Sequence, residues 1–201
     1  GGWDLRQAVL EGAAWGDVNL HDANLQHADF NRAQLQGAVL DAARLQGARF
    51  READLSGASL GSARAAAVDL ACADLSRVVG SGADFSGANL IGATFREAQL
   101  PGALFVGAKL EGACFQSACL RDGVFIQAST GEVDFRSADL SGADLAGLDL
   151  RRARLGGANL ARASLVACMM SLEARCDWIT SSRPSPFQSV TFKPLTSPST
   201  R

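Results

Sequence analysis

Four aspartates, Asp134, Asp139, Asp144 and Asp149, follow one another at five-residue intervals and form the densest group of side chains that could do chemistry. Carboxylates that converge can bind a metal ion or act as a general acid and base. The repeat in which they occur, described below, points successive members in four different directions. We therefore expect each aspartate to hydrogen-bond backbone groups of its own turn instead of joining a site.

Two histidines, His21 and His27, are the only imidazoles of the chain. Neither has a cysteine or a second histidine at the spacing of zinc ligands. The glycines obey the same five-residue period and form no phosphate-binding loop between a strand and a helix. We expect no metal, no cofactor and no enzymatic activity.

Five cysteines occur, at Cys72, Cys114, Cys119, Cys168 and Cys176. In the repeat, Cys114 and Cys119 face outward on adjacent sides, so a bridge between them is not expected. Cys168 and Cys176 would lie about 12 Å apart on a straight helix, too far for a disulfide. A bend between them would bring them together, so both states stay open.

The stretch "ADFSGANLIGATF" (83–95) places Phe85, Leu90 and Phe95 five residues apart, each preceded two positions earlier by alanine. On an α-helix such residues scatter around the axis, and on a continuous strand they alternate between faces. A chain that forms a short extended segment and turns a corner every five residues buries all of them. Within each segment, the central residue and the residue two before it share the inward face.

The same rule holds from Leu5 to Leu165, where 33 pentapeptides share one register. The central residue is Leu, Phe or Trp except at Ala65, Gly80 and Thr130. Alanine dominates two positions before the centre, and glycine is commonest two positions after it, as a corner with unusual dihedral angles favours. Asp and Asn recur immediately before the centre, where they can bond the turn.

The segments "ANLQHADF", "ADLSGASL", "ADFSGANL" and "ADLSGADL" resemble the A(D/N)LXX motif of the pentapeptide-repeat family over about residues 3–167. The resemblance implies an all-β fold, a right-handed four-sided parallel β-helix of about eight coils. Phe and Leu alternate at the centres from 85 to 135, which fits four sides because residues ten apart then lie on opposite walls. We expect the solenoid to span 1–167, a short helical cap 168–180, and an extended Pro/Ser-rich tail 181–201.

Solenoid ends expose the core and need caps. We expect Trp3 and Trp15 to close the first coil, with Met169 and Met170 as core filler in the C-terminal cap. The coil with centres Ala65, Leu70, Leu75 and Gly80 has lost two large residues. We expect an underpacked core there, partly filled by Phe85 and Phe95.

The net charge is −2, and no block of like charges indicates a nucleic-acid or membrane-surface partner. No run of 18 apolar residues indicates a membrane span, and no signal peptide is visible. Family members are common in cyanobacteria and chloroplasts. The resemblance therefore favours a plastid location, the thylakoid lumen included, with the bacterial cytoplasm as the alternative.

Two functions remain. The first is a scaffold or assembly subunit that binds a partner protein through outward apolar residues of one wall and through the tail. The second, implied by the resemblance, is a DNA-mimicking protein that binds gyrase and protects it from quinolones. The repeats carry 15 basic and 19 acidic residues, a weak charge for a DNA mimic. The predicted contact residues are Leu104, Val106, Val124, Ile126 and Val166 on the wall, and Phe187, Val190, Phe192 and Leu195 in the tail.

Overall fold

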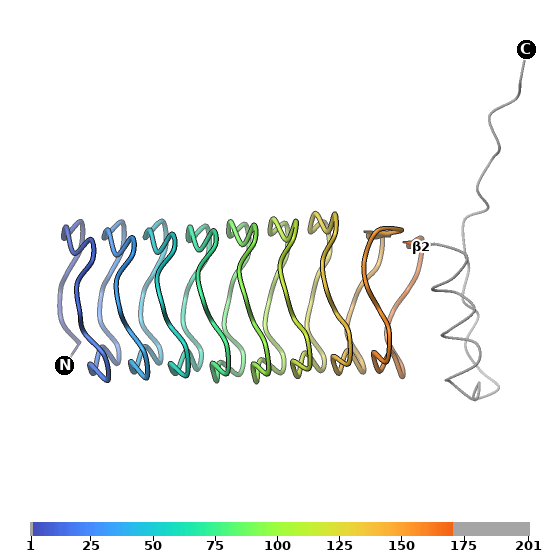
Figure 1. Ribbon diagram of the computed structural model, residues 1–201, viewed down its shortest axis with the longest axis horizontal. Coiled ribbons are helices and arrows are strands. Elements are labelled where there is room, and N and C mark those ends of the chain that lie inside the picture. Colours follow the sequence, from blue (N-terminus) through green and yellow to red (C-terminus); the bar gives the residue numbers. More distant parts are fainter. Residues whose placement is uncertain (1, 171–201) are drawn as a thin grey trace, which may run out of the picture.

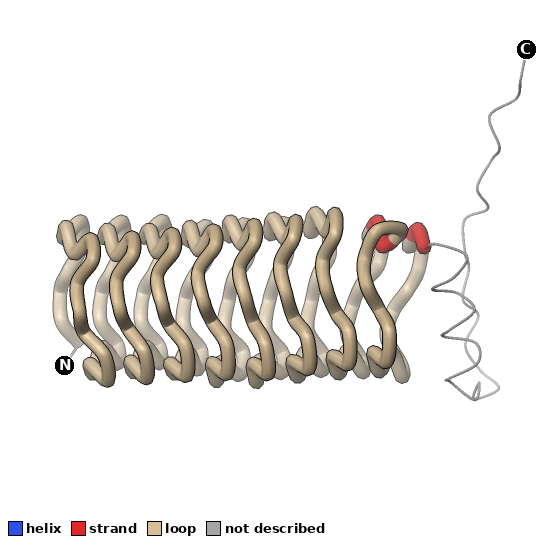
Figure 2. Tube along the Cα trace, viewed as in Figure 1, coloured by secondary structure: helices blue, strands red, loops and turns tan. Residues whose placement is uncertain are grey.

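The computed structural model describes residues 2–170, and they form a rod of stacked coils (Figure 1). Every bridge between coils is parallel and joins residues 20 apart, from Asp4 with Asn24 to Asp144 with Ser164. One coil therefore takes four pentapeptides, which confirms the four-sided β-helix. Two strands are long enough to be named, β1 (Asp149–Leu150) and β2 (Met169–Met170), and they pair with each other; turns and isolated bridges make up the rest (Figure 2).

Each side of a coil repeats one hydrogen-bond pattern. The Phe85 amide donates to the Leu104 carbonyl of the next coil at 2.7 Å, and the Leu104 amide donates back to the Ala83 carbonyl at 2.9 Å. At the corner, the Ala88 amide closes a turn on the Phe85 carbonyl at 3.0 Å. Gly87 lies inside that turn with a φ of 66°. Its left-handed conformation explains why glycine recurs at this position of the repeat.

The core is a column of fully buried side chains. Phe85, Phe105 and Phe125 stack along one wall, with ring centroids 5.4 and 4.7 Å apart. Phe95 and Phe115 stack on the opposite wall, 4.7 Å apart, and meet the first column edge to face. The alternation of Phe and Leu in the sequence therefore builds two opposed aromatic columns, as predicted.

The coil that contains Ala65 and Gly80 is underpacked on one side only. A small apolar void is lined by Ala65, Leu45 and Phe85 among others. At Gly80, a Cβ atom would lie 2.8 Å from a methyl group of Leu100, so the neighbouring coil already fills that space. The predicted filling by Phe85 is consistent with the void's lining, but Leu100, and not Phe95, occupies the Gly80 side.

The two ends differ from the sequence-based expectation. Trp15 is half-buried and packs on the core, whereas Trp3 is 52% exposed and contacts Trp15 edge to face. At the other end the β-helix continues past the predicted boundary at 167 to β2, at the end of the described residues. Met170 occupies a buried central position, as a further repeat would require. The remainder of the predicted cap and the tail lie outside the described residues.

Cys168 faces the core of the rod. Its side chain is fully buried, and its Sγ lies 2.7 Å from the Leu145 carbonyl oxygen, to which the thiol donates. Burial raises the pKa of the Cys168 thiol. Among the described residues, Cys72, Cys114, Cys119 and Cys168 form no disulfide with one another. Cys176, the other half of the bridge left open above, lies outside them.

Candidate protein-interaction surface

Outward side chains of one wall form what we call the apolar stripe, made of Leu104, Val106, Val124, Ile126 and Val166. Each side chain stands immediately before or after an inward centre, and alternation along the strand turns it to solvent. Leu104 is 36% exposed, Ile126 37% and Val166 55%, whereas Val106 and Val124 are half-buried. All five side chains thus lie on the outward face of one wall, and their role in binding stays a prediction.

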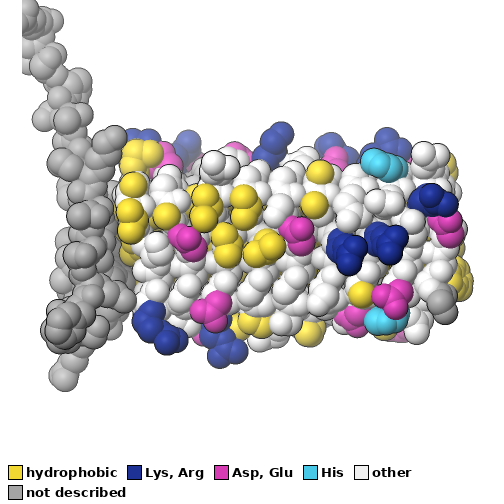
Figure 3. Space-filling model, turned by 180° about the vertical axis from the view of Figure 1, so that it is seen from behind, with side chains coloured by type: hydrophobic (Ala, Val, Ile, Leu, Met, Phe, Trp, Pro, Cys, Tyr) yellow, Lys and Arg dark blue, Asp and Glu magenta, His cyan; other side chains and the backbone are white. Residues whose placement is uncertain are grey.

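Contacts between coils make most of the stripe continuous. Leu104 and Val124 are partners in a parallel bridge. The Gly107 amide donates to the Ile126 carbonyl at 2.9 Å, which holds Val106 and Ile126 on successive coils. Val166 lies two coils beyond Ile126. Hydrophobic side chains gather in a row on this face in Figure 3.

One member of the row was missed in the sequence. Ala146 is half-buried and stands between Ile126 and Val166 in the same column. The Gly147 amide binds the Val166 carbonyl at 2.9 Å, which places these two coils in register. The spacing of 20 residues between Ile126, Ala146 and Val166 was the signal that could have found it.

The same wall carries charges toward the N-terminal end of the rod. Arg44 pairs with Arg64, and Arg64 pairs with Asp84, in consecutive backbone bridges. Both arginines are exposed, and within residues 2–170 neither forms an ion pair. Asp84 accepts the Ser86 amide at 2.9 Å. Beyond Leu104 the column therefore continues with Asp84 and then with two arginines that form no ion pair with a side chain of the described rod.

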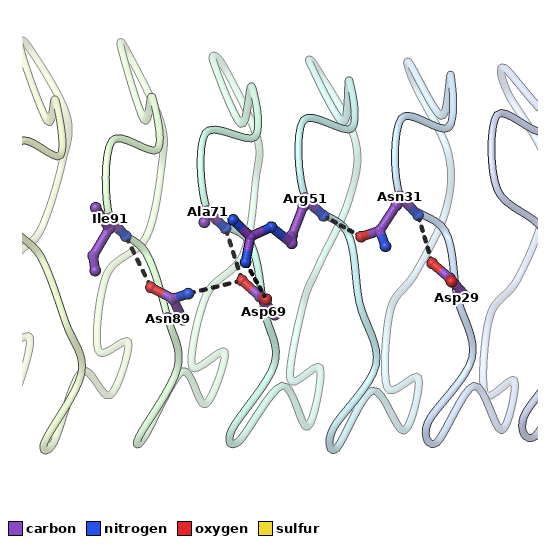
Figure 4. A network of polar contacts seen from close by, with 7 residues as sticks. All are labelled: Asp29, Asn31, Arg51, Asp69, Ala71, Asn89 and Ile91. Atoms are coloured by element: carbon purple, nitrogen blue, oxygen red, sulfur yellow. Dashed lines mark hydrogen bonds and ion pairs between the residues drawn. The ribbon is translucent and has the colours of Figure 1, made fainter.

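On the neighbouring wall, in contrast to Arg44 and Arg64, the polar side chains form hydrogen bonds with one another (Figure 4). The Arg51 amide donates to Asn31 at 2.9 Å, and its guanidinium reaches Asp69 at 3.4 Å. Asn89 donates to the same Asp69 carboxylate at 2.9 Å. Ile91 is 41% exposed on this wall. It lies beside the polar ladder, several coils from Val9, the other exposed hydrophobe of this wall, and serves as a control for the stripe.

The four aspartates considered at the outset behave as predicted. Asp134, Asp139, Asp144 and Asp149 each accept the backbone amide two residues ahead, at 3.0–3.2 Å. They sit on successive sides of the coil. They cap turns and do not build a catalytic cluster.

An interaction that the sequence analysis missed joins Asp134 to Arg136. The Arg136 Nε donates to Oδ1 at 2.9 Å and an Nη to Oδ2 at 2.6 Å, a bidentate pair. This hydrogen bonding lowers the pKa of Asp134 and raises that of Arg136. The same fork joins Asp149 to Arg151. Arginine two residues after aspartate was the signal, since both side chains then share one outward face.

Elsewhere in the described residues, few side chains that could bind a metal ion or take part in catalysis lie close together. Among residues 2–170, no group of three His, Cys, Asp or Glu side chains could hold a metal ion. His21 is engaged with Asp22, Nε2 to Oδ2 at 3.2 Å. Residues 2–170 contain no helical segment that could span a lipid bilayer. The tail residues Phe187, Val190, Phe192 and Leu195 lie outside the described residues, and their contact role stays a prediction.

The sequence profile of the family described as "Pentapeptide repeats" matches this chain in eight copies. The matched segments are 4–41, 33–70, 58–96, 88–127, 124–157 and 131–166. They cover most of the rod. No curated protein matches the sequence.

Solved structures resemble the rod as a whole. HetL, a pentapeptide repeat protein involved in heterocyst differentiation regulation from the cyanobacterium Nostoc sp. strain PCC 7120, is 32% identical, covers 83% of this chain and 80% of its own, and has a TM-score of 0.66. QnrB1, a plasmid-mediated fluoroquinolone resistance protein, is 16% identical over 90% of this chain and 97% of its own, with a TM-score of 0.63. At that identity QnrB1 shows the fold alone.

Proposed function

This chain belongs to the pentapeptide repeat family, and on that premise we propose that it is a non-catalytic scaffold that binds a partner protein through the apolar stripe. The observation that carries the proposal is the continuity of the outward apolar side chains from Leu104 to Ile126 along one wall. Contiguous exposed apolar area commonly marks an interface. The involvement of HetL in regulation supports a role in binding.

The magnitude of the apolar contribution is sufficient for a contact. A fully buried Val, Leu or Ile side chain contributes about 1.5–3 kcal/mol. The stripe residues are already partly covered by the rod, so each can gain roughly a third to a half of that on docking. Five such side chains sum to several kcal/mol before the cost of association. Charge complementarity at Arg44 and Arg64 would then add specificity more than affinity.

The alternative is the gyrase-binding DNA mimic. The fold likeness to QnrB1 is compatible with it. The charge pattern is not favourable, because Arg44 and Arg64 stand in the outward column where a mimic needs acidic groups. We therefore place this function second and test it alongside the first.

The test is a pull-down from a lysate of the source organism, using four forms of the protein. These are the wild type, the double variant Val124→Asp/Ile126→Asp, the control Ile91→Asp on the neighbouring wall, and a truncation after Thr180. A photo-crosslinking amino acid at Val106 identifies which captured protein touches the stripe. Circular dichroism and thermal unfolding verify that each form is folded.

We expect one captured protein to crosslink at Val106, to be lost from the double variant and to be retained by Ile91→Asp. Equal recovery in the double variant and the wild type would overturn the role of the stripe. Loss only on truncation would assign binding to the tail. Inhibition of gyrase supercoiling by the wild type would promote the alternative.

A further inference from the structure

We propose that a second copy of this chain docks on the stripe, wall to wall, in a parallel two-fold dimer; the inference rests on the proposed function because it uses the same surface. The wall presents two outward columns, one before and one after its inward centres. A two-fold axis parallel to the rod relates the two copies. The same wall of each copy then faces the other, and equivalent coils lie at the same level along the two rods. Each residue of the first column then opposes the residue two positions later in the second copy. The first column is Asp4, Asn24, Arg44, Arg64, Asp84, Leu104, Val124, Asp144 and Ser164.

Apolar side chains meet apolar side chains in this arrangement. Leu104 opposes Val106 of the second copy, and Val124 opposes Ile126 of the second copy. Symmetry repeats both contacts, so four of the five stripe residues of each copy are covered. Val166 opposes Ser164 and lies at the edge of the apolar contact.

The charges on the wall are compatible with the same operation. The second column carries a single charged residue, Arg6, and it opposes Asp4 of the other copy. Arg44 and Arg64 oppose Gln46 and Ala66, so no like charges face each other directly. Within one chain, Asp4 and Arg6 already form an ion pair, with the Arg6 Nη 2.7 Å from the Asp4 Oδ2. In the dimer, each of these side chains can also pair with the oppositely charged side chain of the second copy.

Other arrangements are less favourable. An antiparallel dimer that superposes the apolar coils, with Leu104 over Val124, sets Asp84 against Asp144 of the second copy. On the neighbouring wall, the parallel operation would set Arg49 against Arg51. Like charges in an interface cost binding free energy. Of the arrangements compared, the parallel one on the stripe's wall brings no like charges into direct opposition.

The available area is that of a weak dimer. From Asp4 to Ser164 the wall spans eight steps of about 4.8 Å, roughly 38 Å, and its width of three to four extended residues is about 10–13 Å. The footprint is therefore about 400–500 Å² per copy in projection, near the lower limit of about 1,000 Å² in total for a specific interface. We expect a dimer whose population rises with protein concentration.

The experiment measures the oligomeric state of the purified full chain by analytical ultracentrifugation, from about 1 to about 200 μM. We expect a monomer–dimer equilibrium. The double variant Val124→Asp/Ile126→Asp should weaken self-association at least about 100-fold, because it places carboxylates in an apolar contact. Ile91→Asp should change it less than about threefold. A monomer throughout, or a dimer that ignores the double variant, overturns the proposal.

The relative orientation of the two copies is determined with a photo-crosslinker at Gln26, in a mixture of isotopically labelled and unlabelled protein. A parallel dimer yields crosslinks between copies near Asn24, whereas the antiparallel dimer leaves no coil opposite Gln26. Crosslinks elsewhere, or none from a confirmed dimer, overturn the parallel arrangement. The two proposals fail separately: purified protein that stays monomeric removes the dimer, while stripe-dependent capture of another protein would still support the proposed function.

Discussion

The side-chain hydroxyl of Thr130 donates a hydrogen bond to the carbonyl oxygen of Asp149, 2.5 Å away, where a backbone amide makes this contact on other sides of the rod. On the preceding side the Phe125 amide donates to the Asp144 carbonyl at 2.9 Å. Bridges join Lys109 to Ser129, but within the described residues none joins Ser129 to Asp149. The ladder of backbone hydrogen bonds on this wall is therefore interrupted at one coil. There the Thr130 side chain donates the bond that a backbone amide donates elsewhere.

Hydrogen exchange should detect the interruption. We expect the amides of Thr130 and Asp149 to exchange at least about tenfold faster than those of Leu110 and Ser129 on the same wall, because the latter two are bonded between coils and the former two are not. Exchange measured by NMR or by mass spectrometry with residue resolution gives the comparison. Equal protection at all four amides would show that the ladder is continuous in solution.

Phe85 should be among the most important residues for stability. It is fully buried and lies against Phe105 and Phe95 with centroid distances of 5.4 and 5.9 Å. We expect Phe85→Ala to lower the free energy of unfolding by about 3–5 kcal/mol, as is usual for a buried phenylalanine. Chemical denaturation measures it, with the exposed Ile91→Ala as the control. A loss under about 1 kcal/mol would contradict the packing described.

Ala65→Val should stabilise the protein. Ala65 lines the apolar void between Leu45 and Phe85, and two added methyl groups would bury new surface there. We expect a gain of about 0.5–1.5 kcal/mol in the free energy of unfolding. The matched control is Ala83→Val, an equal change at a buried alanine outside the void's lining, which should be neutral or destabilising. Destabilisation by Ala65→Val would mean that Leu45 and Phe85 already close the gap.

Stability in acid should depend on the Asp134–Arg136 pair. The hydrogen bond from Arg136 holds the pKa of Asp134 below its ordinary value of about 3.9. The ionised carboxylate therefore contributes stability that is fully present above that ordinary pKa and is lost as pH falls through the lower folded pKa. We expect Asp134→Asn to show a shallower decline of the unfolding midpoint between about pH 5 and about pH 2 than the wild type.

A denaturation series across that pH range supplies the measurement. The control is Asp74→Asn, since Asp74 is exposed and its carboxylate accepts the Ser76 amide at 2.8 Å without an arginine fork. Parallel curves for Asp134→Asn and the wild type would show that the pair adds nothing to acid stability.

Much of the candidate site could be derived from the sequence. Once the coil length of 20 residues is known, Leu104 and Val124 must be neighbours, and strand alternation turns them outward together. The same spacing of 20 residues places Ala146 between Ile126 and Val166, and it places Arg64 on the wall of the stripe. The pairing of Arg136 with Asp134 was harder to predict, because it depends on the side-chain rotamer that a long arginine adopts.

The sequence by itself determined the period of five and the identity of the buried centres, because these follow from local alternation and from a register without insertions. The four sides were implied by the family resemblance and fitted by the alternation of Phe and Leu, and the bridges between residues 20 apart confirm them. The tertiary structure decided what depends on contacts between coils. Leu100 fills the space beside Gly80, Thr130 replaces an amide in one ladder, and Met170 extends the rod. Each results from side chains 20 residues apart competing for the same space or the same hydrogen-bonding group, and no pattern within a single pentapeptide records that competition.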